Sequence, residues 1–212
     1  MLFARSTFDD ILSDLTAGRL LPGEVTGHFM RPATTARYGD FPEDLHPDLR
    51  AALERRGIAR PYSHQAEAIA HARAGRHVVL ATPTASGKTL CFNVPVLDRV
   101  LREPDARALY LFPTKALAQD QYAGLYELVQ AAGVEVKTYT FDGDTPEDAR
   151  RAVRDHGQIV ITNPDMLHAA VLPQHTKWTK LFENLKWVVI DELHTYRGVF
   201  GSHVAHLIGR LR

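Results

Sequence analysis

The stretch ATPTASGKT, residues 81–89, decides the fold of this chain. It follows an apolar run at residues 77–80 and precedes residues 90–100, whose apolar side chains recur with helical spacing. A loop between a buried strand and a helix binds phosphate because the free N–H groups at the start of the helix point at the anion. The stretch therefore predicts a strand, a phosphate loop and a helix, and with them a site for a nucleoside triphosphate.

Each part of this loop has an expected role. Lys88 would reach the β- and γ-phosphates, Thr89 would place its hydroxyl on Mg²⁺, and the backbone would cradle the phosphate oxygens. The strict pattern GxxxxGK[ST] has glycine where this chain has Thr82, so a chance match in a surface turn is the alternative. The flanking elements favour the binding loop. The residues expected to hold the phosphates are Thr82, Pro83, Thr84, Ala85, Ser86, Gly87, Lys88 and Thr89.

The composition is that of an ordinary globular chain. Its 212 residues are 45% hydrophobic, enough for one α/β domain with an extension. Lys plus Arg and Asp plus Glu number 25 each, so nucleic-acid binding would have to be local. The single cysteine, Cys91, excludes an internal disulfide and is interpreted as a small core residue. No apolar run approaches the roughly 18 residues of a membrane span and no signal-peptide pattern is present, so we expect a cytoplasmic protein.

The N-terminal part predicts a lead-in rather than a separate globular domain. Residues 1–57 are expected to be helical and extended, and residues 58–212 to form the nucleotide-binding domain. An amphipathic helix is predicted at 8–17 and a second helix at 47–56, each followed by glycine. Residues 21–47 hold four prolines and three glycines, which favours an extended segment.

A base-reading element is predicted shortly before the phosphate loop. Ser63 can cap a helix that ends at Gly75. Gln65 on this helix has an amide whose donor and acceptor complement adenine N6 and N7, and Tyr62 or the guanidinium of Arg60 can stack on the base. Taken alone, Gln65 is more simply a solvated helix residue. Its position just before the phosphate loop favours adenine recognition.

Two predicted strands end in a hydroxyl residue at the start of a helix. The strand at 107–112 is followed by Thr114 and Lys115, and the strand at 158–162 ends in Thr162. Ligands bind at the carboxyl edge of open α/β sheets, and a hydroxyl beside a lysine suits a phosphodiester. A helix cap with a solvated lysine explains Thr114 and Lys115 equally well.

Two pairs of possible metal ligands are interpreted as structural. Asp142 and Asp144 follow a predicted strand at 134–141 and could hold a metal, but an Asx-rich turn before a helix is the commoner explanation. His203 and His206 lie in a predicted C-terminal helix without a third ligand or an acid partner nearby. Neither pair predicts a metal site.

A fifth predicted strand, at 186–190, delivers acidic residues to the same edge. Asp191 can hold Mg²⁺ through water opposite Thr89, Glu192 can deprotonate the water that attacks the γ-phosphate, and His194 could sense that phosphate. An acidic pair after a strand is a weak signal alone. About 100 residues after a phosphate loop, with strands and helices alternating between, it becomes a strong one. The predicted catalytic residues are Lys88, Asp191, Glu192 and His194, and the predicted metal ligands are Thr89 and Asp191.

The ordered strings HQAEAI, ATPTASGKT, FPTKALA, TNPD and DELH resemble the first RecA-like domain of superfamily 2 DExH helicases, over roughly residues 55–212. The longer strings FDGDTPEDAR, TNPDMLH and DELHTYRGVFGSHVA resemble more narrowly the bacterial DNA repair helicases of the YprA or MrfA group. The resemblance implies an α/β, RecA-like P-loop domain with a mostly parallel sheet flanked by helices, plus a helical N-terminal extension. It implies ATP and Mg²⁺ as cofactors, and movement along single-stranded or partly duplex DNA in the 3′ to 5′ direction.

The resemblance also assigns residues and sets limits. It implies that Gln65 recognises adenine. The residues that it implies for contact with the DNA backbone are Thr114, Lys115, Thr162 and Asn163. Such helicases continue through a strand with a Ser-Ala-Thr type motif and a second RecA-like domain with arginine fingers, and neither precedes Arg212. We therefore expect a part of a longer helicase that, alone, binds ATP weakly and hydrolyses it poorly.

Three functions follow from the residues. The leading hypothesis is a DNA-dependent ATPase motor module. The second is a nucleic-acid binding module that clamps in a nucleotide-dependent way without turnover. The third is a P-loop transferase acting on a small molecule, but the sequence has no evident acceptor lid and this function leaves Gln65 and Thr114 without a role.

Overall fold

The computed structural model describes residues 7–18, 27, 29, 32, 35–83 and 86–211, and the contacts divide the chain into residues 1–36 and residues 37–212. The first unit holds α1 (Phe8–Thr16), the helix predicted at 8–17. Thr7 N donates to Asp10 Oδ2 at 2.9 Å, and Thr7 Oγ1 accepts from Asp10 N at 3.3 Å. This capping box satisfies free N–H groups at the helix start, so the helix begins through local chemistry. The boundary expected at residue 57 falls inside the second unit.

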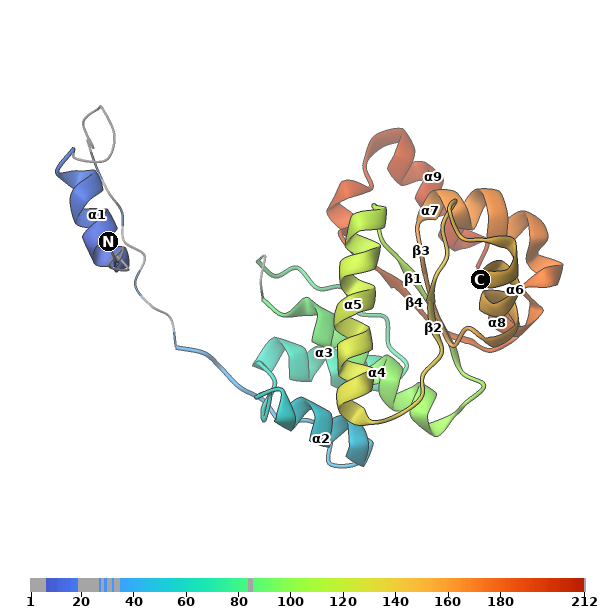
Figure 1. Ribbon diagram of the computed structural model, residues 1–212, viewed down its shortest axis with the longest axis horizontal. Coiled ribbons are helices and arrows are strands. Elements are labelled where there is room, and N and C mark those ends of the chain that lie inside the picture. The colour runs from blue at the N-terminus through green and yellow to red at the C-terminus, as the bar shows by residue number, and fades with distance from the viewer. Residues whose placement is uncertain are drawn as a thin grey trace, which may run out of the picture. The chain divides into compact units, whose positions relative to one another are not determined.

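A parallel sheet forms the centre of the second unit (Figure 1). Its strands in the described chain are β1 (Arg107–Leu111), β2 (Thr138–Thr140), β3 (Ile159–Thr162) and β4 (Leu185–Ile190). They lie in the order β2-β3-β1-β4, and each neighbouring pair is parallel. All five residues of β1 are buried, because strands flank both of its edges and helices cover both of its faces.

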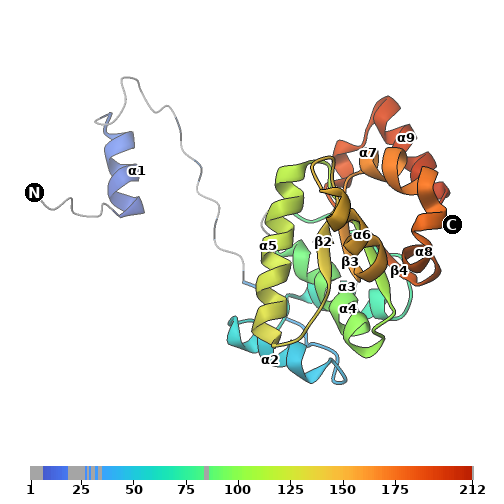
Figure 2. The same ribbon diagram turned by 45° about the vertical axis from the view of Figure 1, so that its right-hand side comes forward.

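Helices cover both faces of the sheet (Figures 1 and 2). The helices on one face are α2 (Pro47–Arg55), α3 (Ser63–Arg73), α4 (Lys88–Arg102) and α5 (Lys115–Ala132). The helices on the other face are α6 (Glu147–His156), α7 (Pro164–Met166), α8 (Thr179–Glu183) and α9 (Gly198–Gly209). Along β1, Tyr110 packs in the first core and Leu109 in the second, as the two-residue period of a strand requires. The predicted fold class is confirmed.

Some predicted elements differ from the structure. The strand predicted at 77–80 is wrong, since this run has no regular secondary structure and Val79 is 80% exposed. A strand needs a neighbour to pair its N–H and C=O groups, and in the described chain β4 pairs only with β1. Within the described chain, residues 77–80 therefore have no strand paired with them. The sequence pattern of this run cannot show whether such a neighbouring strand exists. The strand predicted at 134–141 is shorter, since only β2 forms.

The helix predicted after β3 also differs in form. It is α-helical only in α7 and continues as a π-helix at Leu167–Val171 and a 3₁₀-helix at Leu172–Lys177. A separate 3₁₀ turn, Leu193–Thr195, follows β4. Cys91 in α4 is buried as predicted, and burial raises the pKa of its thiol to about 11.

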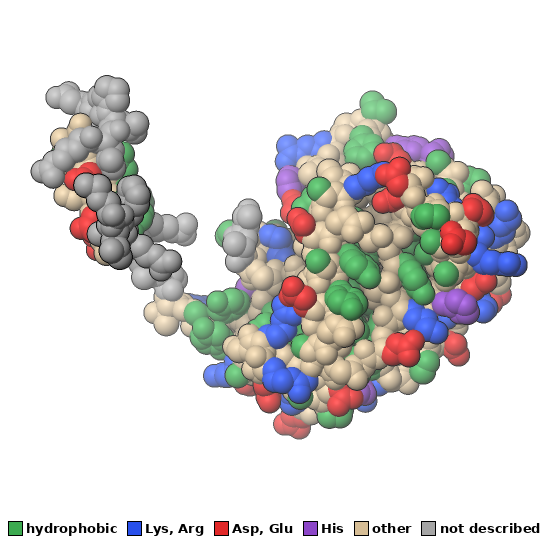
Figure 3. Space-filling view, viewed as in Figure 1, with side chains coloured by type: hydrophobic (Ala, Val, Ile, Leu, Met, Phe, Trp, Pro, Cys, Tyr) green, Lys and Arg blue, Asp and Glu red, His purple; other side chains and the backbone are tan. Residues whose placement is uncertain are grey.

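The surface carries charges of both signs. Figure 3 shows acidic and basic side chains intermixed over the face in view, in line with the totals of 25 each. On this face, a nucleic acid would find local contacts with single basic side chains rather than one broad basic surface. No helix in the described ranges combines the length and the apolar character needed to cross a membrane.

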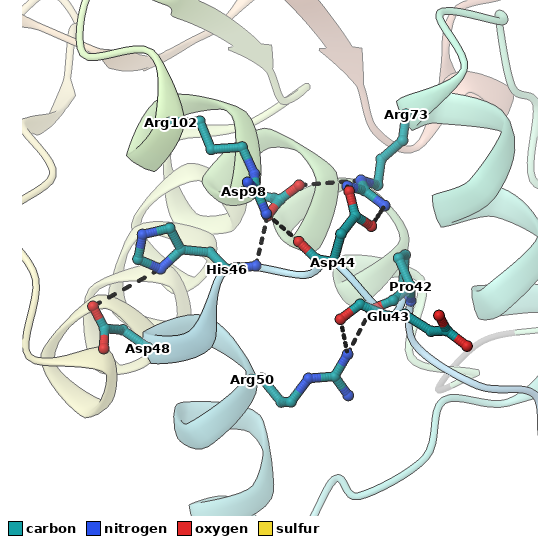
Figure 4. A network of polar contacts seen from close by, with 9 residues as sticks. All are labelled: Pro42, Glu43, Asp44, His46, Asp48, Arg50, Arg73, Asp98 and Arg102. Carbon is teal, nitrogen blue, oxygen red and sulfur yellow. Dashed lines mark hydrogen bonds and ion pairs between the residues drawn. The ribbon is translucent and has the colours of Figure 1, made fainter.

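A buried carboxylate ties the start of the second unit to α3 and α4 (Figure 4). The Asp98 side chain, 4% exposed, accepts hydrogen bonds from His46 N at 2.8 Å, Arg73 Nε at 3.1 Å and Arg102 Nε at 3.2 Å. Arg73 also donates to both carboxylate oxygens of Asp44 at 2.8 and 2.7 Å, and these hydrogen bonds lower the pKa of Asp44 to about 2. The network thus joins the two helices that flank the predicted nucleotide site.

Substitution Asp98→Asn is expected to lower the free energy of unfolding by about 2–3 kcal/mol, because two guanidinium groups would then face a buried neutral side chain. Glu103→Gln is the matched control. It removes an exposed pair at the end of the same helix, with Arg99 Nε 2.9 Å from Glu103 Oε2 and both side chains 46% exposed, and should cost below about 0.5 kcal/mol. Urea denaturation measures both, and equal losses would show that the Asp98 network does not stabilise the domain.

Candidate nucleotide and nucleic-acid site

The described residues of the phosphate loop bind the Lys88 ammonium. Gly87, directly before α4, has a φ of 74°, which favours glycine. Lys88 Nζ donates to the carbonyl oxygens of Thr82 at 3.0 Å and Pro83 at 3.1 Å, and the Thr82 and Ser86 hydroxyls hydrogen bond at 2.7 Å. Phosphate oxygens would bind this ammonium more strongly than neutral carbonyls do, because a charge-assisted hydrogen bond is stronger. Two predicted loop residues lie outside the described ones: Thr84 and Ala85.

Gln65 links the start of α3 to the phosphate loop. Its side chain is 2% exposed, Oε1 accepts from Tyr62 N at 2.8 Å, and Nε2 donates to Gly87 O at 2.9 Å. The residue before α3 is Tyr62, so the predicted cap at Ser63 is wrong. Ser63 is instead the first residue of α3, and the amide of Gln65, the third residue, accepts from the N–H of Tyr62 as in a capping box.

Stacked aromatic rings connect the predicted lead-in to this link. The Tyr38 and Tyr62 rings stack with centroids 5.3 Å apart, and the Tyr62 and His64 rings stack at 5.9 Å. His64 Nε2 lies 3.0 Å from Ser86 O of the phosphate loop. The sequence predicted Tyr62 but missed Tyr38 and His64, although the place of His64 beside Gln65 is a signal that could have found it. Arg60 is occupied elsewhere, since its Nε donates to Asp40 Oδ1 at 3.0 Å.

The acidic residues at the end of β4 are held by local bonds. Asp191 N donates to Leu111 O at 3.1 Å, which continues the pairing of β4 with β1, and Asp191 Oδ1 accepts from Glu192 N at 2.8 Å. Glu192 has a φ of 49°, a strained left-handed conformation for a side chain of this size. Its Oε2 lies 3.2 Å from His194 Nδ1. Glu192 and His194 are therefore neighbours in the structure.

The donors predicted for Mg²⁺ fit that ion chemically. A threonine hydroxyl and a carboxylate are hard oxygen ligands, which Mg²⁺ prefers. Thr89 Oγ1 donates to Gln121 Oε1 at 3.3 Å, and only one oxygen of Asp191 takes part in the bond to Glu192. Within the described residues, no hydrogen bond or ion pair joins the phosphate loop directly to Asp191 or Glu192.

Tyr196 is a residue of this region that the sequence did not single out. Its hydroxyl is buried without a hydrogen-bond partner in the described chain, and burial, followed by the charges of Asp191 and Asp165, raises its pKa to about 12. Gly201 of α9 packs on its backbone, since a β-carbon there would lie 2.5 Å from Tyr196 O. Tyr196 thus lies between the acidic end of β4 and the segment after β3.

The residues predicted for DNA contact lie at the carboxyl edge in the order of the strands. Thr114 Oγ1 accepts from Leu117 N at 3.3 Å as the cap of α5, and Asn163 Oδ1 accepts from Met166 N at 2.8 Å as the cap of α7. Phe112 N donates to Thr162 O at 2.9 Å, which brings the ends of β1 and β3 together.

Two of the predicted contacts are occupied within the protein. Thr162 is 3% exposed and its hydroxyl donates to Phe141 O at 2.6 Å, so its side chain is not offered to DNA in this conformation. Lys115 Nζ lies 2.5 Å from Asp144 Oδ2. Asp144 N donates to Asp142 Oδ1 at 2.8 Å, which is the Asx turn that the sequence favoured for this acidic pair.

A parallel sheet with a phosphate loop before one helix and an acidic pair at a strand end defines a RecA-like nucleotide-binding domain. The chain belongs to the DEAD/DEAH box helicase family, which matches residues 62–212. It is 51% identical over 208 residues to the uncharacterized ATP-dependent helicase YprA of Bacillus subtilis, covering 98% of this chain and 27% of YprA. This chain thus spans about a quarter of that relative's length.

Solved structures agree with this assignment. The crystal structure of the helicase MrfA bound to DNA and AMPPNP has a TM-score of 0.89 and 51% identity, covering 97% of this chain and 28% of that one. Lhr of Mycobacterium smegmatis bound to ssDNA and AMP-PNP has a TM-score of 0.69 and 25% identity, covering 82% of this chain and 23% of that one. The chain is therefore similar to the YprA and MrfA helicases within its family.

The contact between Gln65 and the phosphate loop can be tested with two glycines. A β-carbon at Gly87 would lie 2.4 Å from Gln65 Nε2, whereas Gly57 has a similar φ of 76° with no atom within 4 Å. Both alanine substitutions should lower the free energy of unfolding by about 1–2 kcal/mol through backbone strain. Only Gly87→Ala should weaken binding of a fluorescent ATP analogue, by about 10-fold or more. Equal affinities of the two variants would contradict a role for the contact in nucleotide binding.

Proposed function

We propose that this chain is the ATP-binding motor domain of a DNA helicase or translocase, which couples ATP hydrolysis to movement on single-stranded DNA. The shared edge of the sheet is the observation that carries this proposal. Asp191 and Glu192 follow β4, whereas Thr114 and Lys115 follow its neighbour β1. Neighbouring strands lie about 4.8 Å apart, so a change at the hydrolysis residues can reach the predicted DNA contacts by a short path.

The nucleotide chemistry is assigned to residues on both sides of this edge. Lys88 binds the β- and γ-phosphates, Thr89 and Asp191 hold Mg²⁺, and bound Mg²⁺ neutralises charge on those phosphates. Glu192 orients and deprotonates the attacking water, and His194, 3.2 Å from it, responds to the γ-phosphate. The strained backbone at Glu192 supports this role, because strain of this kind is concentrated at functional sites.

Adenine recognition is assigned to Gln65. A primary amide has two N–H donors and two acceptor lone pairs, and the bonds to Tyr62 and Gly87 use one of each. The remaining pair complements adenine N7 and N6. Because the side chain is 2% exposed, the base reaches it only when neighbouring rings move, and we assign that movement to the stacked Tyr62 and His64.

The DNA-binding part of the proposal is supported by relatives. MrfA is bound to DNA and AMPPNP, and Lhr is bound to ssDNA and AMP-PNP, in their solved structures. Because the chain spans 27% of YprA, we propose a second RecA-like domain of the longer protein as its partner. A 3′ to 5′ direction and a role in DNA repair belong to the same proposal and rest on the resemblance. A cytoplasmic location, as expected from the sequence, is also part of this proposal.

The nucleotide-dependent clamp is the second candidate. It needs ATP to bind at the phosphate loop and a strand to bind at the carboxyl edge, but it needs no deprotonation of the attacking water by Glu192. The small-molecule transferase is less well supported. In such an enzyme, Thr114 and Lys115, which suit a phosphodiester, would have no function. A transferase would be indifferent to added single-stranded DNA, whereas a motor would be stimulated by it.

Substitution Lys88→Ala should abolish ATP binding while the fold stays intact, because it removes the ammonium that charge-assisted bonds to phosphate require. Lys177→Ala, at an exposed lysine of the 3₁₀ segment, is the control and should bind as the original chain does. Equilibrium titration with a labelled ATP analogue measures both. Unchanged affinity for the ATP analogue in Lys88→Ala would contradict the proposal that the phosphate loop binds ATP.

Substitution Glu192→Gln separates the motor from the clamp. In the longer protein proposed above, a motor should lose about 100-fold or more of its DNA-stimulated phosphate release and keep ATP binding, because the amide cannot accept the proton of the attacking water. Glu183→Gln, at an exposed position of α8, should leave release unchanged. Identical release rates in Glu192→Gln and in the unmodified longer protein would instead favour the clamp.

A further inference from the structure

The lysine predicted to bind DNA phosphate already binds a carboxylate. Lys115, the first residue of α5, places Nζ 2.5 Å from Asp144 Oδ2, with 50% of the Lys115 side chain and 87% of the Asp144 side chain exposed. The hydrogen bond between them, followed for Asp144 by its attraction to the ammonium, raises the pKa of Lys115 and lowers the pKa of Asp144. Both groups are therefore charged at neutral pH.

The loop that presents Asp144 is held in place on several sides. Asp142 Oδ1 accepts from Asp144 N at 2.8 Å, and Thr145 Oγ1 accepts from Asp142 N at 2.9 Å. The Arg150 guanidinium donates to Thr145 O at 2.7 Å and to Gly143 O at 3.1 Å. Because these bonds order the loop already, the ion pair with Lys115 costs little further conformational entropy. Asp144 is thus presented to Lys115 by a pre-ordered turn.

We propose that Asp144 occupies Lys115 in place of a nucleic-acid phosphate, so that a single strand must displace this carboxylate before Lys115 can bind its backbone. A carboxylate and a phosphodiester both offer anionic oxygens to the ammonium, and they compete for the same donors. The inference rests on the proposed function and adds an affinity-determining residue to its DNA edge. Displacement is within reach of a ligand, since an exposed ion pair contributes little free energy.

The opposite role for Asp144 would be to orient Lys115 toward the phosphate. In that case the carboxylate and the phosphate would share the ammonium, which has three N–H donors. The two roles predict opposite signs when the carboxylate is neutralised. Competition predicts tighter binding without the charge, whereas orientation predicts weaker binding.

The experiment measures binding of a fluorescein-labelled oligo(dT) of about 20 nucleotides by fluorescence anisotropy in the 212-residue chain. Asp144→Asn should bind about 3- to 10-fold more tightly, and the slope of log K against log salt should stay the same, because Lys115 contacts one phosphate in both complexes. Asp148→Asn is the matched control. Asp148 is exposed in the first turn of α6, and its carboxylate makes no hydrogen bond or ion pair within the described chain, so binding should change by less than about 2-fold.

A second background tests whether the effect passes through Lys115. When Lys115 is already replaced by alanine, the added substitution Asp144→Asn should change the affinity for oligo(dT) no more than the added substitution Asp148→Asn does. The reason is that the ammonium for which Asp144 and the phosphate compete is gone. Unchanged or weaker binding by Asp144→Asn alone, or an equal gain from Asp148→Asn, would overturn the inference.

The outcomes separate this inference from the proposed function. If the original chain binds oligo(dT) but Asp144→Asn gains nothing, only the competition by Asp144 fails. If no variant binds oligo(dT) at any salt concentration, the DNA-binding part of the proposed function fails and the inference fails with it. Circular dichroism of each variant confirms that the fold is retained.

Discussion

The parallel pairing of β1 with β3 on one edge and β4 on the other is the constraint on which the rest of the structure depends. Parallel strands point their carboxyl ends to the same edge, so the segments after these three strands must emerge side by side. The bonds from Phe112 N to Thr162 O and from Asp191 N to Leu111 O extend this alignment beyond the strands. The residues proposed for hydrolysis and for DNA binding therefore share an edge through backbone geometry, before any side chain is considered.

A second set of contacts places the nucleotide-binding elements relative to one another. Asp98 joins α3 and α4 at their C-terminal ends, and Gln65 joins the start of α3 to Gly87 at the start of α4. The two helices are thus connected at both ends by polar groups that are themselves buried. Because unpaired buried polar groups are costly, each connection favours a single arrangement of the helices.

The predicted functional groups share one property in this structure: each is bonded to another part of the protein. Lys88 donates to loop carbonyls, Lys115 to Asp144, and Gln65 to Gly87. A ligand that binds these groups must therefore replace a hydrogen-bond partner within the protein, because the donors are already paired. The net free energy of each exchange is the difference between two bonded states, which keeps binding reversible and dependent on the neighbouring residues.

The sequence by itself determined the elements and residues that depend on local chemistry. Helix caps, the spacing of apolar residues and the alternation of strands with helices predicted α1, α2, α5 and the core strands. The order of the motifs singled out Lys88 and Asp191 as candidate site residues. Only the tertiary structure decided that residues 77–80 lack a strand partner, that Tyr38 and His64 stack beside the loop, and that Asp144 holds Lys115. These outcomes depend on which distant segments meet, and a pattern confined to neighbouring residues has no information about such contacts.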